Sequence, residues 1–275
     1  MPLYQINFGE VSKEKQEEAE DKINVYLCTL TRNGQARDDY HVVVSGNQMM
    51  AYIHMNGRDA IQRQYHSKYG LSELGQVVDI IGQEPTWSEV GGENKDITTA
   101  YSDASHLFLF THLGDASWGL FHGDSGFGIP LYCLPVSEYF KERFYFWVRN
   151  YQRLDALFMN GYLEIQCYKE LASPESMLSK EGRSLCAELS KALNIPVYYY
   201  LLRYWGRREG EAVRLCPGCG ETWQQSQRNE NDELFHHFHF KCDHCFLVSH
   251  IASAYDDERH ARIGEWREKK TENRK

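Results

Sequence analysis

Two cysteine pairs near the C-terminus constrain the fold of this chain more than any other feature. Both have the form Cys-x-x-Cys, and 22 residues separate Cys216–Cys219 from Cys242–Cys245. A two-residue spacing lets one tight turn direct both sulfurs at one metal ion, and two such turns supply the four thiolates that Zn²⁺ prefers in a tetrahedral site. The sequence therefore predicts one structural Zn²⁺ with Cys216, Cys219, Cys242 and Cys245 as ligands.

The residues around these cysteines predict a zinc ribbon. Pro217 stiffens the first turn, and Gly220 follows its second cysteine, where the chain often needs a positive φ. The second turn has Phe246 at the corresponding position, so we expect it to be less regular. Between the turns, residues 221–227 and 234–241 alternate as two strands around a polar turn at 228–233, which predicts a hairpin.

Histidines in the returning strand allow a sharper alternative. His237 and His239 share one face of this strand, and Phe238 and Phe240 share the other. The histidines could form a second metal site or a mixed Cys/His site, but an exposed ribbon face is favoured, because four cysteines already complete one site. A redox dithiol would need only one of the two pairs.

The charge of the chain is distributed unevenly. The net charge is −9, but residues 203–275 contain equal numbers of basic and acidic residues, so residues 1–202 carry the whole excess. An acidic body argues against broad nucleic-acid binding, which depends on neutralising phosphates. A local contact near the ribbon stays open, and its candidate residues are Arg203, Arg207, Arg208, Arg214, His237 and His239.

The sequence also indicates a compartment. Residues 1–22 lack the apolar core of a secretory signal, and no run approaches the 18 apolar residues of a membrane helix. We therefore expect a cytoplasmic protein without membrane association. The four remaining cysteines lie in apolar settings at irregular spacings, which favours buried free thiols over disulfides. They are Cys28, Cys133, Cys167 and Cys186.

Composition and periodicity predict an α/β (α+β) fold. Hydrophobic residues make up 42% of the chain, enough for a sizeable core. In residues 1–84 the pattern is β-α-β-β-α-β, which is the order of a ferredoxin-like unit. The expected strands are 3–8, 40–44, 49–55 and 77–81, and the expected helices are 12–31 and 60–69.

Three further regions follow. Residues 83–104 are polar and predict a linker, and residues 105–205 predict an α/β helical region packed on the first unit. The expected strands are 106–112, 118–121 and 197–204, and the expected helices are 137–158, 163–171 and 180–193. Residues 206–255 form the predicted zinc ribbon, and residues 256–275 a charged helix or tail.

One loop invites a catalytic interpretation. His122-Gly-Asp-Ser-Gly126 contains the Gly-Asp-Ser-Gly of trypsin-like proteases, but those enzymes are all-β and place their histidine and aspartate upstream in characteristic settings. A hydrolytic metal site would need His106, His112, His122 and nearby carboxylates Asp115 and Asp124 to converge, without a helical His-x-x-x-His pattern to support it. Loop structure is favoured, no catalytic residue is predicted, and we expect a protein that is not an enzyme.

The ribbon region resembles a known family. With the preceding YYYLLRYWG and the following FHFKCDHCFLVS, residues 197–253 resemble an uncharacterised bacterial family described as zinc-ribbon-containing, candidate nucleic-acid-binding proteins. The resemblance implies that Cys216, Cys219, Cys242 and Cys245 are zinc ligands, and it implies no catalytic residue. Outside this region it extends only to length and a large α/β portion.

Two classes of function remain open. The first is binding of nucleic acid or a ribonucleoprotein through the ribbon and the arginines near Arg207. The second is protein binding by the acidic body, as an adaptor, a regulator or an immunity-type inhibitor of a basic toxin, since acidic surfaces attract basic partners.

Overall fold

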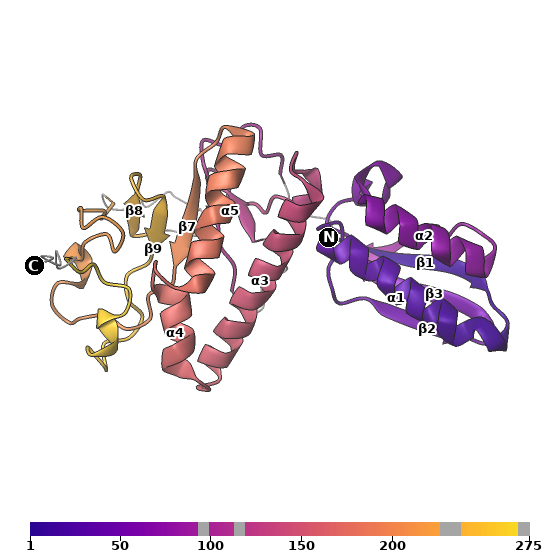
Figure 1. Cartoon of the computed structure of the whole chain (residues 1–275), viewed down its shortest axis with the longest axis horizontal. Helices are drawn as coiled ribbons and strands as arrows, with labels where there is room; N and C mark the ends of the chain where they lie inside the picture. The colour runs from indigo at the N-terminus through magenta and orange to yellow at the C-terminus, as the bar shows by residue number, and fades with distance from the viewer. Residues whose placement is uncertain (93–98, 113–118, 226–237, 269–275) are drawn as a thin grey trace, which may run out of the picture. The chain divides into compact units, whose positions relative to one another are not determined.

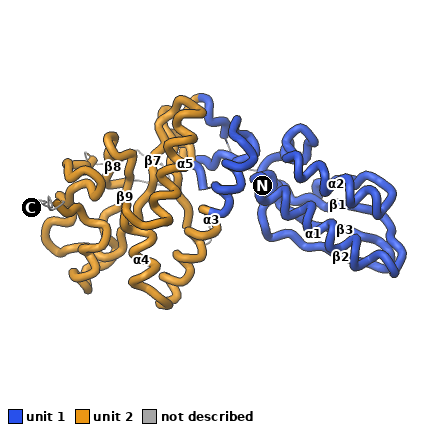
Figure 2. Tube along the Cα trace, in the orientation of Figure 1, with its two compact units in different colours: residues 1–102, 116–120, 127–146 blue, residues 103–115, 121–126, 147–275 orange. Residues whose placement is uncertain are grey.

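The computed structural model describes residues 1–92, 99–112, 119–225 and 238–268. The fold is mixed α/β, as predicted, and contains two sheets. Figure 1 labels most of its elements. The chain divides into two compact units (Figure 2). Unit 1 comprises residues 1–102, 116–120 and 127–146, and unit 2 comprises residues 103–115, 121–126 and 147–275.

Unit 1 contains a four-stranded antiparallel sheet with the strand order β2-β3-β1-β4. Its main elements are β1 (Pro2–Glu10), α1 (Gln16–Arg32), β2 (His41–Ser45), β3 (Gln48–His54), α2 (Lys68–Ile81) and β4 (Thr86–Gly92). The order along the chain and across the sheet is that of a ferredoxin-like unit. In Figure 1, α1 and α2 lie next to each other over the same face of the sheet.

The covered sheet face forms the core of unit 1, because buried side chains alternate with less buried ones along β3 and along most of β1. Ile6, Ala51 and Ile53 are fully buried on the helix-covered face. Met50 and Tyr52, which lie between the buried positions of β3, are only half-buried. Successive side chains of a strand point to opposite faces, so Met50 and Tyr52 lie on the sheet face opposite to the one that α1 and α2 cover.

Two expected elements of unit 1 were wrong. The segment 77–81, expected to be a strand, is the end of α2, and the true fourth strand β4 lies in the segment expected to be a linker. The helix expected at 60–69 begins only at Lys68, because the Ser67 side chain caps it by accepting a hydrogen bond from the Gly70 amide. At its other end Gly82 adopts a left-handed φ of +87° and stops the helix.

Unit 2 contains a five-stranded sheet with the strand order β6-β5-β7-β9-β8. The strands are β5 (Leu107–Leu109), β6 (Leu120–His122), β7 (Val197–Leu201), β8 (Phe240–Cys242) and β9 (Leu247–Ser249). The helices are α3 (Glu138–Met159), whose first nine residues belong to unit 1, α4 (Glu164–Ala172) and α5 (Met177–Leu193). These helices, β5, β6 and β7 confirm the predicted elements of this region, with shifts of a few residues at their ends.

Two strands of the segment predicted to be a zinc ribbon belong to this sheet. Strand β9 runs parallel to the central strand β7, with Tyr199 opposite Leu247, and β8 pairs antiparallel with β9 at the edge. The hairpin predicted between the cysteine pairs is present where it is described, since Lys241 N donates to Trp223 O and Gln225 N donates to His239 O. Residues 226–237, which include the expected turn, lie outside the described residues.

The C-terminal segment differs from the expected helix. Within 256–268 the structure has one 3₁₀ turn, His260–Arg262, and otherwise turns, a bend and chain without regular secondary structure. The other 3₁₀ helices are Lys13–Lys15, Asp59–Ile61, Arg63–Tyr65, Leu131–Cys133 and Glu211–Val213. None of the helices in the described part of the chain has the length and apolar composition needed to cross a membrane.

Candidate metal centre

Two turns bring the four predicted cysteine ligands together. The first turn, with Cys216 and Cys219, is closed by a hydrogen bond from Gly220 N to Cys216 O at 2.8 Å. The second connects β8 to β9, and Cys245 N donates to Cys242 Sγ at 3.3 Å. The first turn is therefore closed within its own backbone, and the second by a bond from its backbone to the sulfur of a predicted ligand.

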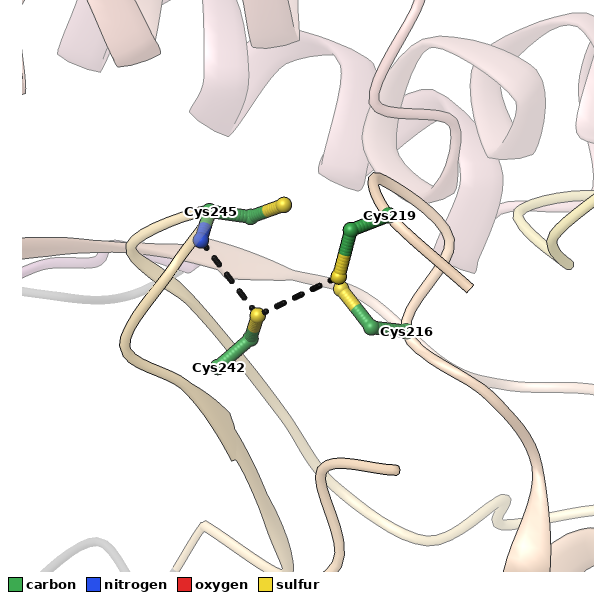
Figure 3. Close-up of side chains that lie close together, drawn as sticks. All are labelled: Cys216, Cys219, Cys242 and Cys245. Carbon is green, nitrogen blue, oxygen red and sulfur yellow. Dashed lines mark hydrogen bonds between the residues drawn. The ribbon is translucent and has the colours of Figure 1, made fainter. Parts of the chain in front are cut away.

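The geometry of the sulfurs matches a tetrahedral site. All four Sγ atoms lie within 4.8 Å of one another, and Cys219 Sγ is 3.7 Å from Cys242 Sγ. A tetrahedron of sulfurs about 2.3 Å from a central metal ion has an edge of about 3.8 Å. Figure 3 shows the side chains converging from the two turns. The residues present therefore fit a metal ion held by four thiolates.

Both turns have a residue with a positive φ at the same position. Gly220 and Phe246 each follow the second cysteine of a pair, and their φ angles are +78° and +52°. The expectation of a less regular second turn was wrong, because Phe246 adopts the left-handed conformation that glycine adopts in the first turn. A Cβ at Gly220 would lie 2.5 Å from the Trp266 ring, so the first turn also needs glycine for space.

The electrostatics of the four clustered thiols favour binding of a cation. Burial raises the pKa of Cys216 well above its usual range and raises the pKa of Cys245 to about 12. Burial also acts on Cys219, but hydrogen bonds from the Glu221 amide and neighbouring sulfurs outweigh it and lower the pKa of this thiol. A bound divalent metal ion would offset half of the formal charge of four thiolates, and metal binding would release protons from the thiols.

A second group of potential ligands lies beside the sulfurs. Cys219, Glu221 and His244 also have ligand atoms within 4.8 Å of one another. His244 Nδ1 is 3.7 Å from a Glu221 carboxylate oxygen, and both side chains are more than 60% exposed. Because Cys219 already belongs to the four-sulfur set, this exposed pair lies at the rim of the candidate metal centre.

Two of the four candidate arginines are enclosed within unit 2. The guanidinium of Arg203 donates to both carboxylate oxygens of Glu211, at 2.9 and 2.7 Å, and the Arg203 side chain is 2% exposed. Arg214 lies over the rings of Trp223 and Phe240, at 4.6 and 4.1 Å from their centroids, and its side chain is 7% exposed. Neither guanidinium is available to an external ligand.

The other two arginines are exposed. Arg207 Nε donates to Glu265 at 2.9 Å, so its charge is already neutralised. Arg208 presents its side chain at the surface, while its backbone amide donates to Glu258 at 3.2 Å. The partners Glu211 and Glu265 could not be predicted from the sequence, because the order of residues along the chain does not show which carboxylates meet these arginines.

The candidate histidines do not form a described metal site. His237 lies outside the described residues. His239 is half-buried, and its Nδ1 accepts a hydrogen bond from Ile251 N at 3.3 Å. Among the described residues, His239 belongs to no cluster of potential metal ligands. The structure therefore differs from the expectation of an exposed ribbon face at His239, which is half-buried and hydrogen-bonded to the backbone.

The histidine-rich loop is held together by its own hydrogen bonds. Asp124 accepts from the Ser105 amide at 2.7 Å and from the Ser105 hydroxyl, and the His106 ring packs against Gly123. His122 is buried and accepts from the amides of Asp124 and Ser125. Where the loop is described, it contains no group of converging metal ligands, and Asp115 lies outside the described residues. Backbone amides thus contact Nδ1 of His122, and its Nε2 lies 3.6 Å from an Asp103 carboxylate oxygen.

The remaining cysteines are unpaired among the described residues. Cys167 and Cys186 are buried and Cys28 is half-buried, but Cys133 is exposed. The expectation of a buried thiol was therefore wrong for Cys133, which lies in the 3₁₀ helix Leu131–Cys133 with its side chain directed outward from the core.

The fold and site together define a mixed α/β protein with a C-terminal cluster of four cysteines that can hold a metal ion. Three families match, each described as a domain of unknown function: DUF8589 over residues 1–91, DUF2310 over 101–202 and DUF8594 over 206–255. An uncharacterised protein of Haemophilus influenzae is 39% identical over 163 residues, which cover 58% of this chain and 77% of that protein. The chain belongs to the family of this uncharacterised protein.

Two further similarities extend the comparison. A second uncharacterised protein of Haemophilus influenzae is 38% identical over 163 residues, and the match spans 60% of its length. Among solved structures, Rv0793 from Mycobacterium tuberculosis is 12% identical, with a TM-score of 0.28 and a match over 34% of this chain and 98% of that chain.

Proposed function

We propose that this chain is a non-enzymatic protein that binds one structural Zn²⁺ and recognises nucleic acid, alone or in a ribonucleoprotein, through its zinc ribbon. Four cysteine ligands would fill a tetrahedral shell and leave no position for water or substrate, which is typical of structural rather than catalytic zinc. An all-sulfur tetrahedral set also favours Zn²⁺ over harder divalent cations. When bound, the ion would supply a fixed link between the two turns.

The observation that carries the recognition part is a basic surface beside the second turn. The exposed face of α5 carries Lys180, Arg183 and Lys191, and this face and the turn at 244–246 line the same cavity. Local cations attract phosphates even on a protein that is acidic overall. This surface replaces the arginines near Arg207 as the support for nucleic-acid binding, because salt bridges within unit 2 occupy three of the four predicted arginines.

The proposal is tested by electrophoretic mobility shift of the zinc-loaded protein. Labelled single-stranded RNA and double-stranded DNA of 20 nucleotides or base pairs would be titrated at 50 and 200 mM NaCl. Binding that weakens steeply with salt is expected, since each neutralised phosphate releases counterions. Absence of any shift at 50 mM NaCl for both nucleic acids would reject nucleic-acid recognition.

A second candidate function is protein binding by the acidic body. It is favoured by the open sheet face of unit 1, where Val43 is 36% exposed beside half-buried Met50 and Tyr52, and by the acidic excess of residues 1–202. An apolar patch on an acidic surface suits a basic protein partner, such as the target of an adaptor, a regulator or a toxin inhibitor. Affinity purification at low salt that recovers no stoichiometric basic protein would count against it.

A further inference from the structure

A cavity lies between α5 and the second cysteine turn of unit 2. Its volume is about 760 Å³, and its walls are the exposed face of α5, the start of β7 at Val197, and residues His244, Cys245 and Phe246. Cavities of about 300 to 1,000 Å³ are typical of small-molecule sites. Because Cys245 is one of the four clustered cysteines, the cavity directly adjoins the candidate metal centre.

The α5 wall of the cavity is basic. Lys180, Arg183 and Lys191 line it, and none of the described residues in its lining is acidic. Their spacings of three and eight residues place them on one face of a helix, with about 12 Å between the axial positions of Arg183 and Lys191. Lys180 is 3.4 Å from the exposed Glu175, whereas Arg183 and Lys191 form no salt bridge with any residue that the structure describes.

The opposite wall carries an exposed aromatic ring in an unfavourable backbone conformation. Phe246 is 44% exposed and has a φ of +52°, a region where glycine is unstrained and a side chain is not. Its ring packs against Tyr198, with 5.6 Å between centroids, which holds it at the cavity. The equivalent position of the first turn is Gly220, so the turn itself does not require an aromatic residue. Strain retained at a site is a reason to look for function there.

We propose that this cavity binds a nucleoside phosphate unit, with the base stacked on Phe246 and the phosphates held by Arg183, Lys191 and Lys180. Guanidinium and ammonium groups are the usual partners of phosphate oxygens, and any base can stack on an aromatic ring. The Ser184 and Ser190 hydroxyls in the same lining can donate hydrogen bonds to a sugar or base, or accept hydrogen bonds from it. The inference rests on the proposed recognition of nucleic acid, and a free nucleotide would present the same chemistry.

A competing role for these cations is to offset the charge of the metal centre. Four thiolates around one divalent ion have a formal net charge of −2, and Cys245 lies in the same cavity wall. In that case, neutralising a cation would weaken metal binding and leave ligand binding unchanged. The two roles can be separated by measuring metal content and ligand affinity on the same variants.

The test compares four forms of the zinc-loaded full chain: wild type, Lys191→Gln, Phe246→Gly and the control Lys169→Gln. Lys169 and Lys191 are both exposed lysines in the last turn of a helix, but only Lys191 lines the cavity. Glycine at 246 removes the ring and favours the observed φ, so the turn is expected to keep its zinc. The probes are an RNA octamer containing all four bases and free UMP, with binding followed by fluorescence anisotropy and calorimetry.

The expected result is specific to the cavity residues. Phe246→Gly should weaken binding at least about fivefold, the loss of one stacked base, and Lys191→Gln about tenfold, the loss of one phosphate contact. Lys191→Gln should also reduce the log–log salt slope for the octamer by about 0.7. Lys169→Gln should behave as wild type. If UMP binds as tightly as the octamer, the ligand of the cavity is a free nucleotide. If only the octamer binds, the ligand is a nucleic-acid strand.

Other results would overturn the proposal. Octamer binding that is unchanged in Phe246→Gly and Lys191→Gln leaves nucleic-acid recognition standing and rejects the cavity as its site. UMP binding without any binding of longer nucleic acid would retain the cavity and reject the proposed function. If neither the octamer nor UMP binds to the wild-type chain, both the proposed function and the proposed cavity site are rejected. Loss of zinc in Lys191→Gln with unchanged affinity for the octamer and UMP supports the charge-offset role. If polyglutamate, added as a competitor, displaces the octamer equally well from wild type and from Phe246→Gly, the cavity binds an acidic protein ligand.

Discussion

Arg203 and Glu211 form a two-point salt bridge that is buried within unit 2. Arg203 Nε and Nη2 lie 2.9 and 2.7 Å from the two Glu211 carboxylate oxygens, and Arg203 Nη1 donates to Ala261 O at 2.6 Å. Burial alone would raise the pKa of Glu211, but the Arg203 guanidinium outweighs it and holds this pKa below its usual range. The pair thereby connects the chain that leaves β7 to the segment that follows the ribbon.

Removing one partner of this pair should strongly destabilise unit 2. Arg203→Ala removes both hydrogen bonds from Arg203 to the buried Glu211 carboxylate and leaves Arg214 Nε, at 3.3 Å, as its remaining counter-charge. Removing one partner of a buried pair typically costs about 3–5 kcal/mol, and Arg214 should keep this loss near the lower value. The matched control is Arg208→Ala, because the Arg208 side chain is exposed and its loss should change the free energy of unfolding by less than about 0.5 kcal/mol. Urea unfolding followed by tryptophan fluorescence measures both changes. Equal midpoints for Arg203→Ala and Arg208→Ala would show that the buried pair contributes little.

Removal of the metal ion should unfold one edge of the sheet in unit 2. Strands β8 and β9 flank the second cysteine turn, and β9 covers one side of β7 through pairs such as Tyr199 with Leu247. A chelator, or Cys219→Ser, should therefore remove hydrogen-exchange protection from β8 and β9 and raise exchange in β7, because zinc binding supplies about 10–16 kcal/mol in small zinc peptides.

The same experiment has internal controls. Amides of α1 in unit 1 should keep their protection, and Cys133→Ser should keep its metal because Cys133 is exposed and is not one of the four clustered cysteines. Undiminished zinc in Cys219→Ser, measured by metal analysis, would contradict the assignment of this ligand.

Local pattern was sufficient to predict the cysteine cluster and most helices. The Cys-x-x-Cys spacing is a property of one turn, and the apolar stripes of α3 and α5 extend over many residues. The run 77–81 was mistaken for a strand because a short apolar segment fits both the helical period of 3.6 residues and the strand period of two. Its correct assignment depended on the cap residue Ser67 and on Gly82, which are also visible in the sequence.

Long-range relations could not be predicted in this way. Arg203 meets Glu211 eight residues later and Glu265 62 residues later, and only the folded chain shows that these three side chains share one buried site. The parallel pairing of β9 with β7 likewise joins segments about 50 residues apart. The sequence therefore predicted a separate ribbon, whereas its strands belong to the sheet of unit 2.

Two glycines of unit 1 should respond differently to alanine. Gly34 and Gly82 follow α1 and α2 with φ angles of +75° and +87°, so alanine at either position should cost about 1–2 kcal/mol of backbone strain. A Cβ at Gly34 would also lie 2.5 Å from Leu131 Cβ, whereas a Cβ at Gly82 meets no atom within 4 Å.

Gly34→Ala should therefore cost an additional amount of about 1–3 kcal/mol from overpacking. Chemical denaturation followed by hydrogen exchange of α1 and α2 amides measures both variants. Similar losses for Gly34→Ala and Gly82→Ala would mean that the segment containing Leu131 moves aside at little cost.

The stability of unit 1 should fall on mild acidification because of His66. This ring is buried, with Nε2 2.9 Å from the Tyr26 hydroxyl oxygen and Nδ1 3.2 Å from Gln62 O. Burial lowers the pKa of His66 below its ordinary value of 6.5, although the Gln62 carbonyl partly opposes this shift. Above pH 6.5 the ring is neutral in both the folded and the unfolded chain, so no penalty arises.

Below pH 6.5 the unfolded chain takes up a proton at His66 before the folded chain does. The free energy of unfolding should then fall with decreasing pH, by at most about 1.4 kcal/mol per pH unit, until the pH reaches the lowered pKa of the folded state. Denaturant titrations between pH 7.5 and 5.0, with hydrogen exchange at the Leu27 amide of α1 reporting on unit 1, measure this dependence. His66→Gln should be less stable than wild type at pH 7.5, but its free energy of unfolding should change less with pH. If the slope of this free energy against pH equals that of wild type, the dependence belongs to other groups.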